Sequence, residues 1–290
     1  MTNNHKTIIA KEMFRLAGDG RKSKGMFKYS QVELANRLGI SNASVSNMIA
    51  GKWASISEAM WRKVENTLRI DIEWNTAETA NFVALTELLE TAQADQLTVG
   101  ISYDAGVGKS HSYKEYERYK KNVIYVECKK YWTVKTYVKS LLNAAGLKAE
   151  GTTEGMLIEF TEHVMGLEDP IIIIDQMDKL REGAFDLFMD IWNDLFRCSA
   201  FVVSGVPALK KRILRGAKND KIGYRELHSR LHKSFLELNT IDLDDVRAVC
   251  IANGLTDEEE ILLINNRCEG DLRVVRKDIK KYFILNKKAA

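Results

Sequence analysis

The sequence predicts a three-layer α/β fold with a parallel sheet, preceded by a small helical unit and followed by a helical segment. Short apolar runs alternate with amphipathic stretches between residues 97 and 240, an order typical of a sheet covered by helices on both faces. A purely helical periodicity occupies the residues before this region, and another follows it. Three domains are therefore expected, and they comprise residues 1–75, 76–240 and 241–290.

Composition limits the class of protein. Of the 290 residues, 45% are hydrophobic and 29% are charged, as expected for a globular protein with a sizeable core. The sequence shows no apolar run of membrane-spanning length and no secretory signal, so a cytoplasmic protein with no membrane partner is expected. The four cysteines lack Cys-x-x-Cys spacing, which favours reduced core residues over a disulfide framework or a metal site.

Positive charge is concentrated at the front of the chain. Residues 1–75 contain 12 Lys and Arg against 7 Asp and Glu, a net charge of +5. The remainder contains 31 against 33, a net charge of −2. A basic N-terminal unit ahead of a nearly neutral body suggests contact with nucleic acid.

The N-terminal unit contains a helix-turn-helix pattern. Short amphipathic helices are expected at residues 30–38 and 42–49, joined by a turn at 39–41, and Ser41 caps the second. Counting from Gln31, the fifth, ninth and fifteenth positions hold a small residue, a glycine and a β-branched residue: Ala35, Gly39 and Val45. The spacing resembles the phage-repressor type of helix-turn-helix.

The second helix of this pattern is expected to face the major groove of DNA. Its exposed residues are expected to be Asn42, Ala43, Ser44 and Asn47. A helical hairpin that binds another protein is the alternative. Three tryptophans follow the pattern, and we expect them in the core or between domains rather than stacked on bases: Trp53, Trp61 and Trp74.

The segment 97–110, which reads LTVGISYDAGVGKS, predicts a strand, a glycine-bearing loop and the start of a helix. Such a loop can wrap backbone N–H groups around a phosphate chain, and the helix N-terminus favours negative charge. Lys109 is expected to reach the β- and γ-phosphates, and Ser110 to hold Mg²⁺. Tyr103 stands where the full pattern has its first glycine, and a chance match in a loop is the alternative. The expected ATP-binding residues are Asp104, Ala105, Gly106, Val107, Gly108, Lys109, Ser110 and His111.

A second segment, residues 170–175, supports the interpretation of residues 97–110 as a phosphate-binding strand, loop and helix. Residues 170–175 form an unbroken apolar run that ends in Asp175, as expected for a strand buried on both faces. Its carboxylate can reach the same Mg²⁺ through water, or it can simply cap the next helix. Gln176 follows where ATPases with such a loop usually have Glu, so slow hydrolysis is expected because glutamine cannot take a proton. Asp178 is a possible substitute, and Gln176 is either native or introduced to trap ATP.

The other elements follow from periodicity. Further strands are expected at residues 122–127, 200–204 and 233–238. Amphipathic helices are expected at residues 76–94, 110–119, 134–145, 153–165, 182–196 and 207–214. The pattern then becomes purely helical, with helices expected at residues 242–253, 257–265 and 271–285.

This order of motifs resembles the AAA+ ATPases over roughly residues 80–285, with the C-terminal helices as the lid. The preceding helix-turn-helix, together with the motifs DQMDKL (175–180) and SGVPAL (204–209), resembles transposition regulators of the MuB, TnsC and IstB type. The resemblance implies ATP and Mg²⁺ as cofactors and ATP-dependent assembly of copies into a ring or filament on duplex DNA. It also implies delivery of that DNA to a transposase. The alternatives are an ATP-gated transcription regulator and a helicase loader or replication initiator.

The resemblance also implies roles for single residues. Ser204 would sense the γ-phosphate, Arg273 would be a second sensor, and Arg225 or Arg230 would reach the neighbouring subunit's ATP as an arginine finger. A surface salt bridge or a DNA contact is the alternative for each arginine. The basic stretch 207–233, with nine Lys and Arg against two Asp and Glu, is a candidate DNA surface. The residues of the ATPase part implied to touch DNA phosphates are Lys129, Lys130, Thr133 and Lys135.

Overall fold

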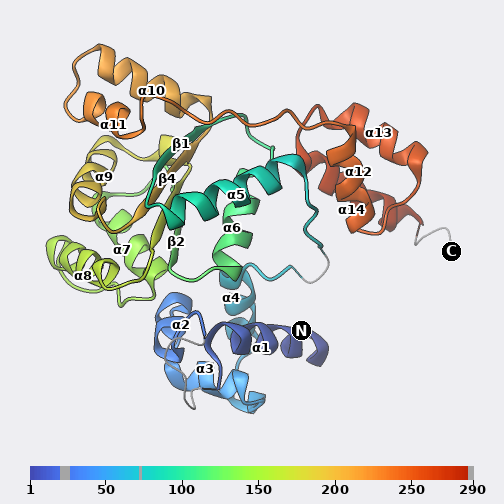
Figure 1. Cartoon of the computed structure of the whole chain (residues 1–290). Coiled ribbons are helices and arrows are strands. Elements are labelled where there is room, and N and C mark those ends of the chain that lie inside the picture. The colour runs from blue at the N-terminus through green and yellow to red at the C-terminus, as the bar shows by residue number, and fades with distance from the viewer. Residues whose placement is uncertain (20–26, 72–73, 287–290) are drawn as a thin grey trace.

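The computed structural model describes residues 1–19, 27–71 and 74–286. Four parallel strands form a sheet in the order β1-β4-β3-β2, and Figure 1 shows helices on both of its faces. The predicted three-layer fold with a parallel sheet is therefore confirmed. The strands are β1 (Thr98–Ser102), β2 (Val123–Glu127), β3 (Ile171–Asp175) and β4 (Ala200–Gly205).

Strand β3 shows why its sequence is apolar without interruption. Successive side chains point to opposite faces of a sheet. Ile171 and Ile173 accordingly pack with residues of α5 and α6, whereas Ile172 and Ile174 pack with residues of α7, α8 and α9. Because both faces are covered, every position on the strand is buried. The helices around the sheet are α5 (Ala80–Ala94), α6 (Lys109–Tyr119), α7 (Val134–Ala145), α8 (Thr153–Met165), α9 (Glu182–Leu195), α10 (Pro207–Lys218) and α11 (Tyr224–Arg230).

The predicted fifth strand, at residues 233–238, is wrong. Within this described segment, the chain makes one isolated bridge to β1, between Ile101 and Leu236. The backbone at His232 and Lys233 has φ values of 52° and 58°, in the left-handed region that a strand does not use. The chain therefore turns after α11 and crosses the edge of the sheet without extending it.

A helical bundle precedes the sheet. Its helices surround one apolar cluster, which includes the fully buried Trp61. The predicted helix-turn-helix is formed by the second and third helices: Ser30 and Glu33 make a reciprocal capping box, Gly39 ends the first in the left-handed region, and Ser41 caps the next. The bundle consists of α1 (Asn3–Ala17), α2 (Gln31–Leu38), α3 (Asn42–Ile49), the 3₁₀ turn η1 (Trp53–Ser55) and α4 (Glu58–Leu68).

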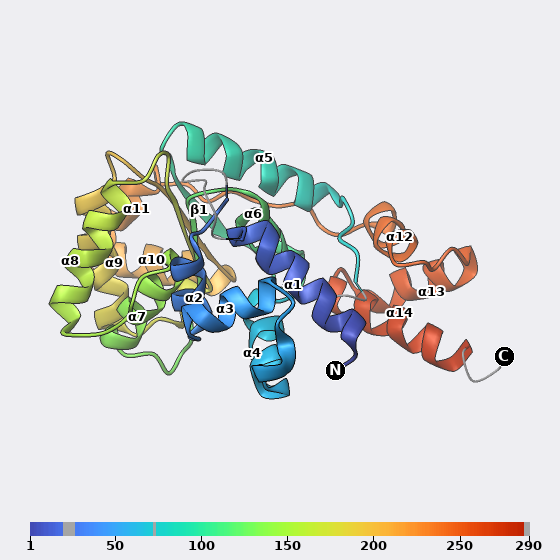
Figure 2. The same cartoon turned by 90° about the horizontal axis from the view of Figure 1, so that it is seen from below.

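This bundle is docked on α6 and α7. Asn36 of α2 donates to the Gly146 carbonyl at 3.0 Å, and Arg37 donates to the Ala144 carbonyl at 2.8 Å and pairs with Glu117. Figures 1 and 2 both show α2 beside α7, and Figure 1 shows α3 on the far side of the bundle from the sheet. The docking thus leaves the second helix of the helix-turn-helix facing away from the sheet.

The last three helices form a separate group. Figure 1 shows them beside the sheet, on the side opposite α10 and α11. Their apolar cluster also takes in Trp74 and Ala77 from the segment that precedes α5. Within the described residues, no helix combines the length and apolarity needed to span a bilayer. The group consists of α12 (Leu243–Ala252), α13 (Glu258–Cys268) and α14 (Leu272–Asn286).

Candidate functional site

The glycine-bearing loop lies at the carboxyl end of β1 and leads into α6. Gly106 and Gly108 have φ values of 91° and 98°, a conformation that side chains rarely adopt. A Cβ atom at Gly106 would also lie 2.4 Å from Oδ1 of Asp271, at the start of α14. Only glycine fits this position, so the loop backbone comes close to its surroundings as a phosphate cradle requires.

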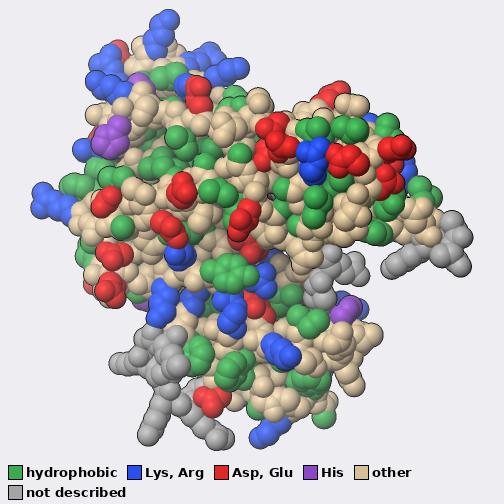
Figure 3. Space-filling model, turned by 45° about the vertical axis from the view of Figure 1, so that its right-hand side comes forward, with side chains coloured by type: hydrophobic (Ala, Val, Ile, Leu, Met, Phe, Trp, Pro, Cys, Tyr) green, Lys and Arg blue, Asp and Glu red, His purple; other side chains and the backbone are tan. Residues whose placement is uncertain are grey.

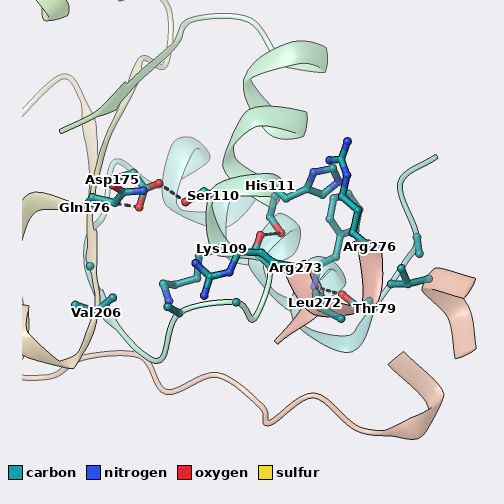
Figure 4. Close-up of a pocket in the computed structure, with 18 of the residues that line it drawn as sticks. Thr79, Lys109, Ser110, His111, Asp175, Gln176, Val206, Leu272, Arg273 and Arg276 are labelled. Carbon is teal, nitrogen blue, oxygen red and sulfur yellow. Dashed lines mark hydrogen bonds between the residues drawn. The ribbon is translucent and has the colours of Figure 1, made fainter. Parts of the chain in front are cut away.

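Lys109 and Ser110 open α6 beneath this loop. The Lys109 ammonium donates to the carbonyls of Tyr103 and Asp104 at 2.7 and 2.6 Å, and the side chain is only 7% exposed. Burial lowers the pKa of Lys109, and the nearby carboxylate of Asp175 partly opposes this decrease. The Ser110 hydroxyl donates to Oδ2 of Asp175 at 2.5 Å, as Figure 4 shows. The structure thus brings the start of α6 and the end of β3, which were expected to share one Mg²⁺, into direct contact.

Asp175 is buried and surrounded by donors. Besides Ser110, the Tyr125 hydroxyl donates to its Oδ2 at 3.0 Å and the Gln176 backbone N–H donates to its Oδ1 at 2.9 Å. Burial raises the pKa of Asp175, whereas these hydrogen bonds oppose the rise. A hydroxyl and a carboxylate this close together are the hard oxygen donors that suit Mg²⁺, so these residues fit that ion.

Gln176 lies beside an ionic cluster at the end of β2. Its backbone is left-handed, with a φ of 56°, and its amide nitrogen donates to Oε1 of Glu127 at 3.4 Å, while Lys179 donates to its amide oxygen. Burial raises the pKa of Glu127, but Lys129 and Lys114 outweigh burial and bring it to about 2. The carboxylate next to Gln176 is thus ionised and engaged with cations.

Sequence reasoning missed Tyr125 and Glu127. They lie two positions apart on β2, so both point to the sheet face that carries Asp175. The register pairs Glu127 directly with Asp175. This signal is available only after β2 and β3 are recognised as parallel neighbours.

A cavity of about 440 Å³ lies between the loop, the segment before α5 and the C-terminal helices. Its apolar wall consists of Trp74, Phe82, Val249 and Leu272, of which none was predicted from sequence. Figure 4 shows Asp175 and Lys109 facing residues of α14 across this space. A phosphate loop at one end and an apolar wall at the other suit the two ends of a nucleoside triphosphate.

Comparison with known protein families agrees with this geometry. A family model described as an AAA domain matches residues 103–213, and one described as a helix-turn-helix matches residues 21–75. The chain combines an AAA domain with an N-terminal helix-turn-helix. A comparison with curated proteins finds no match to the chain. An AAA domain implies nucleotide binding, typically with Mg²⁺, and the helix-turn-helix suggests a DNA partner.

Other predicted site residues line the cavity of about 440 Å³ or lie near it. His111 lines it, and its Nε2 lies 3.0 Å from the hydroxyl of Thr76. Arg273 also lines it, and its Nε and Nη2 donate to Oδ1 and Oδ2 of Asp271 in a bidentate ion pair. Ser204 is fully buried, and its hydroxyl accepts a hydrogen bond from Tyr113 at 2.9 Å. Asp104, Ala105 and Val107 belong to the loop itself.

The two candidate finger arginines lie on α11, which follows the matched residues 103–213 and which Figure 1 shows on the opposite side of the sheet from the C-terminal helices. Arg225 is 71% exposed and pairs with Asp220. Arg230 instead lies over the Trp192 ring, 4.3 Å from its centroid, and pairs with Glu226. Neither is brought to the cavity of its own chain.

The candidate DNA residues lie in two places. In the helix-turn-helix, Asn42 is exposed, whereas Ser44 and Asn47 are half-buried, with Ser44 bonded to Ser41. In the AAA domain they follow β2. Lys130 and Lys135 are exposed there, but Lys129 is paired with Glu127 at 2.7 Å, and Thr133 caps α7.

Proposed function

We propose that this protein is an ATP-dependent DNA-binding ATPase that assembles on duplex DNA and delivers it to a transposase. One observation carries the proposal. A single chain holds a glycine-bearing loop with a buried Lys109 and with Ser110 bonded to Asp175, and a docked helix-turn-helix whose second helix faces outward. The domain boundaries that we propose remain residues 1–75, 76–240 and 241–290.

The roles of the site residues follow from their chemistry. The loop N–H groups and Lys109 would bind the phosphates, while the apolar wall would hold the base. Ser110 and Asp175 would hold Mg²⁺, which supplies charge neutralisation at the phosphates. Gln176 can orient a water molecule, but it cannot accept the proton, so we expect slow hydrolysis.

Replacing Gln176 with Glu should raise the rate of ATP hydrolysis at least about tenfold, because a positioned base contributes roughly 10²–10⁴-fold. Lys179, which already donates to the Gln176 side chain, would pair with the new carboxylate. Turnover at saturating MgATP measures the effect. Gln96→Glu is the matched control, since Gln96 also has a left-handed backbone, with a φ of 52°. It precedes β1 and so lies at the amino end of the parallel strands, whereas Gln176 follows the carboxyl end of β3. An unchanged rate in Gln176→Glu would show that Gln176 does not limit hydrolysis.

Assembly of copies would complete the site. Arg225 is 71% exposed and its partners are the exposed Asp220 and the Ala217 carbonyl, whereas Arg230 lies over the buried ring of Trp192, so we propose Arg225 as the arginine finger that would exchange these partners for a neighbour's ATP. Figure 3 shows Lys and Arg gathered at one end of the molecule, where α10 and α11 lie, and Asp and Glu on the C-terminal helices. Opposite charges at opposite ends favour head-to-tail contact between copies. Exposed acidic residues of the C-terminal group include Asp244, Asp257, Glu258, Glu259 and Glu269.

DNA contact by the AAA domain would fall to the exposed lysines after β2. The double variant Lys130→Ala/Lys135→Ala should weaken binding to all duplex sequences equally, because phosphate contacts carry no sequence information. The slope of log affinity against log salt should flatten by about 1.8 per protomer for two lost contacts. Salt titrations by fluorescence anisotropy measure it. The control is Lys120→Ala/Lys148→Ala, which removes exposed lysines paired with Glu90 and Glu150. An unchanged slope would remove both lysines from the interface.

The proposed function is tested by DNA footprinting and electron microscopy with and without ATP. We expect long protected tracts of any sequence, and ordered assemblies, only when ATP is present, because many weak contacts then act together. Protection of a single site would instead identify an ATP-gated transcription regulator. Strand-transfer assays with a transposase, against loading assays with a replicative helicase, distinguish the transposition role from that of a helicase loader.

A further inference from the structure

We infer that Arg69 is a positioning residue through which the helix-turn-helix unit sets the geometry of the ATP site. The inference rests on the proposed ATP-dependent function. Arg69 directly follows α4, the last helix of the bundle, and its backbone is left-handed there, with a φ of 53°. Its guanidinium extends out of the bundle to the end of β2, where it meets two side chains that each contact a group of the nucleotide site.

The first contact runs through Tyr125. The Arg69 guanidinium carbon lies 5.1 Å from the centroid of the Tyr125 ring, within the range of a cation–π interaction. The hydroxyl of the same ring donates to Oδ2 of Asp175 at 3.0 Å, on the oxygen that also accepts from Ser110. Tyr125 is buried, so a shift of its ring must move its hydrogen bond to Asp175.

The second contact runs through Glu127. Arg69 Nη2 lies 3.4 Å from Glu127 Oε2, and the other carboxylate oxygen of Glu127 accepts from the Gln176 amide at 3.4 Å. Lys114 of α6 and Lys129 share the same carboxylate. Arg69 is therefore one hydrogen-bonded residue away from Gln176 and one residue away from Asp175. These are the two positions at the end of β3 to which we assign the water and the Mg²⁺.

The surface between the bundle and the AAA domain is suited to small movements. A cavity of about 920 Å³ lies between parts of the two, and its lining includes many charged side chains. The contacts across it are mostly ion pairs and hydrogen bonds, including Arg37 with Glu117 and Arg118 with Glu12. Polar interfaces of this kind permit relative motion more readily than a shared apolar core. A small displacement of the bundle, such as one caused by bound DNA, can thus move Arg69 and, through it, the side chains at the ATP site.

Thermodynamic linkage makes the effect reciprocal. If Arg69 couples the two sites, MgATP changes the DNA affinity by the same factor as DNA changes the MgATP affinity. Loss of Arg69 should bring both factors toward one. It should also disturb the rate of hydrolysis more than the binding of ATP, since neither Tyr125 nor Glu127 lines the cavity that we assign to the nucleotide.

The test uses the full chain with Arg69→Ala, Arg69→Lys and, as the matched control, Arg62→Ala, an exposed arginine of α4. We expect Arg69→Ala to lower the single-turnover rate of ATP hydrolysis about tenfold, since small displacements of reacting groups are costly, with the MgATP dissociation constant changed less than about threefold. The ratio of duplex affinities with and without MgATP should fall toward one. Arg69→Lys keeps the charge near Glu127 but loses the planar group over Tyr125, so it should recover part of both effects.

A second variant distinguishes coupling through Tyr125 from a general loss of structure caused by removing Arg69. Tyr125→Phe keeps the ring under Arg69 but removes the hydroxyl, so its effect on the rate combined with Arg69→Ala should be smaller than the product of the two alone. The inference is overturned if Arg69→Ala matches Arg62→Ala in rate and coupling ratio, or if the two effects multiply independently. Failure of the unaltered chain to bind MgATP, by calorimetry, would overturn the proposed function and this inference together.

Discussion

Alanine in place of Lys109 should lower the affinity for MgATP at least about 100-fold and abolish ATP-dependent DNA binding. The ammonium lies at the centre of the loop, where it donates to two carbonyls within 2.7 Å. Charge-assisted hydrogen bonds to phosphate are about twice as strong as neutral ones, and this one would be made in a buried site. Two such bonds, at about 1.5–3 kcal/mol each, account for a loss of this size.

Isothermal titration calorimetry with MgATP measures this loss directly. Lys120→Ala is the matched control, because Lys120 ends the same helix and pairs with the exposed Glu90. Its affinity for MgATP should equal that of the unaltered chain. Retention of tight MgATP binding by Lys109→Ala would mean that the loop is not the phosphate site. The proposed function would then fail at its first step.

Alanine in place of Trp61 should reduce the free energy of unfolding of the N-terminal bundle by about 3–5 kcal/mol. The indole is 0% exposed, and its ring meets the Trp53 ring edge-on, with centroids 5.5 Å apart. It packs in one cluster with Leu34 and Met48, which come from the two helices of the helix-turn-helix. Removal of the indole therefore leaves a cavity that borders both α2 and α3.

Urea titration followed by circular dichroism measures the loss of stability. MgATP affinity should stay within about threefold of the unaltered value, because the cavity for the nucleotide is built from other elements, and loss of Arg69, which links the bundle to the site, is itself expected to change this affinity by no more than that. DNA binding should fall together with the folded fraction of the bundle. Arg62→Ala, one residue along on the exposed face of α4, should change the stability by less than about 0.5 kcal/mol. Equal stability of Trp61→Ala and Arg62→Ala would contradict the assignment of Trp61 to the core.

Elements that depend on neighbouring residues were predictable from the sequence. Helices α7 and α8 have the predicted bounds because local signals end them: Thr133 and Thr152 cap their N-termini, and Gly146 and Gly166 follow their C-termini. The phosphate loop and the β3 run are local in the same way. The interval 233–238 was predicted wrongly because its apolar residues resemble a strand, whereas its pairing depends on a distant edge of the sheet.

The candidate site was predictable only in part. Lys109, Ser110 and Asp175 are brought together as expected, since loops at the carboxyl ends of parallel strands share one edge. The apolar wall of the cavity was not predictable, because Trp74 and Phe82 precede the sheet and Leu272 follows it. Periodicity identifies these residues as apolar, but it does not say that their helices close over the loop.

The sequence by itself determined the four strands of the sheet and most of the helices, where the phosphate loop lies and which two helices make the helix-turn-helix, because each depends on spacing within a few residues. Helices α1, α4 and α11 were not predicted from it. Only the tertiary structure decided what surrounds them. Arg69 meets Glu127 across 58 positions of chain, and Tyr125 meets Asp175 across 50. Such contacts are set by how strands pair and how the bundle docks, and a one-dimensional pattern carries no record of either.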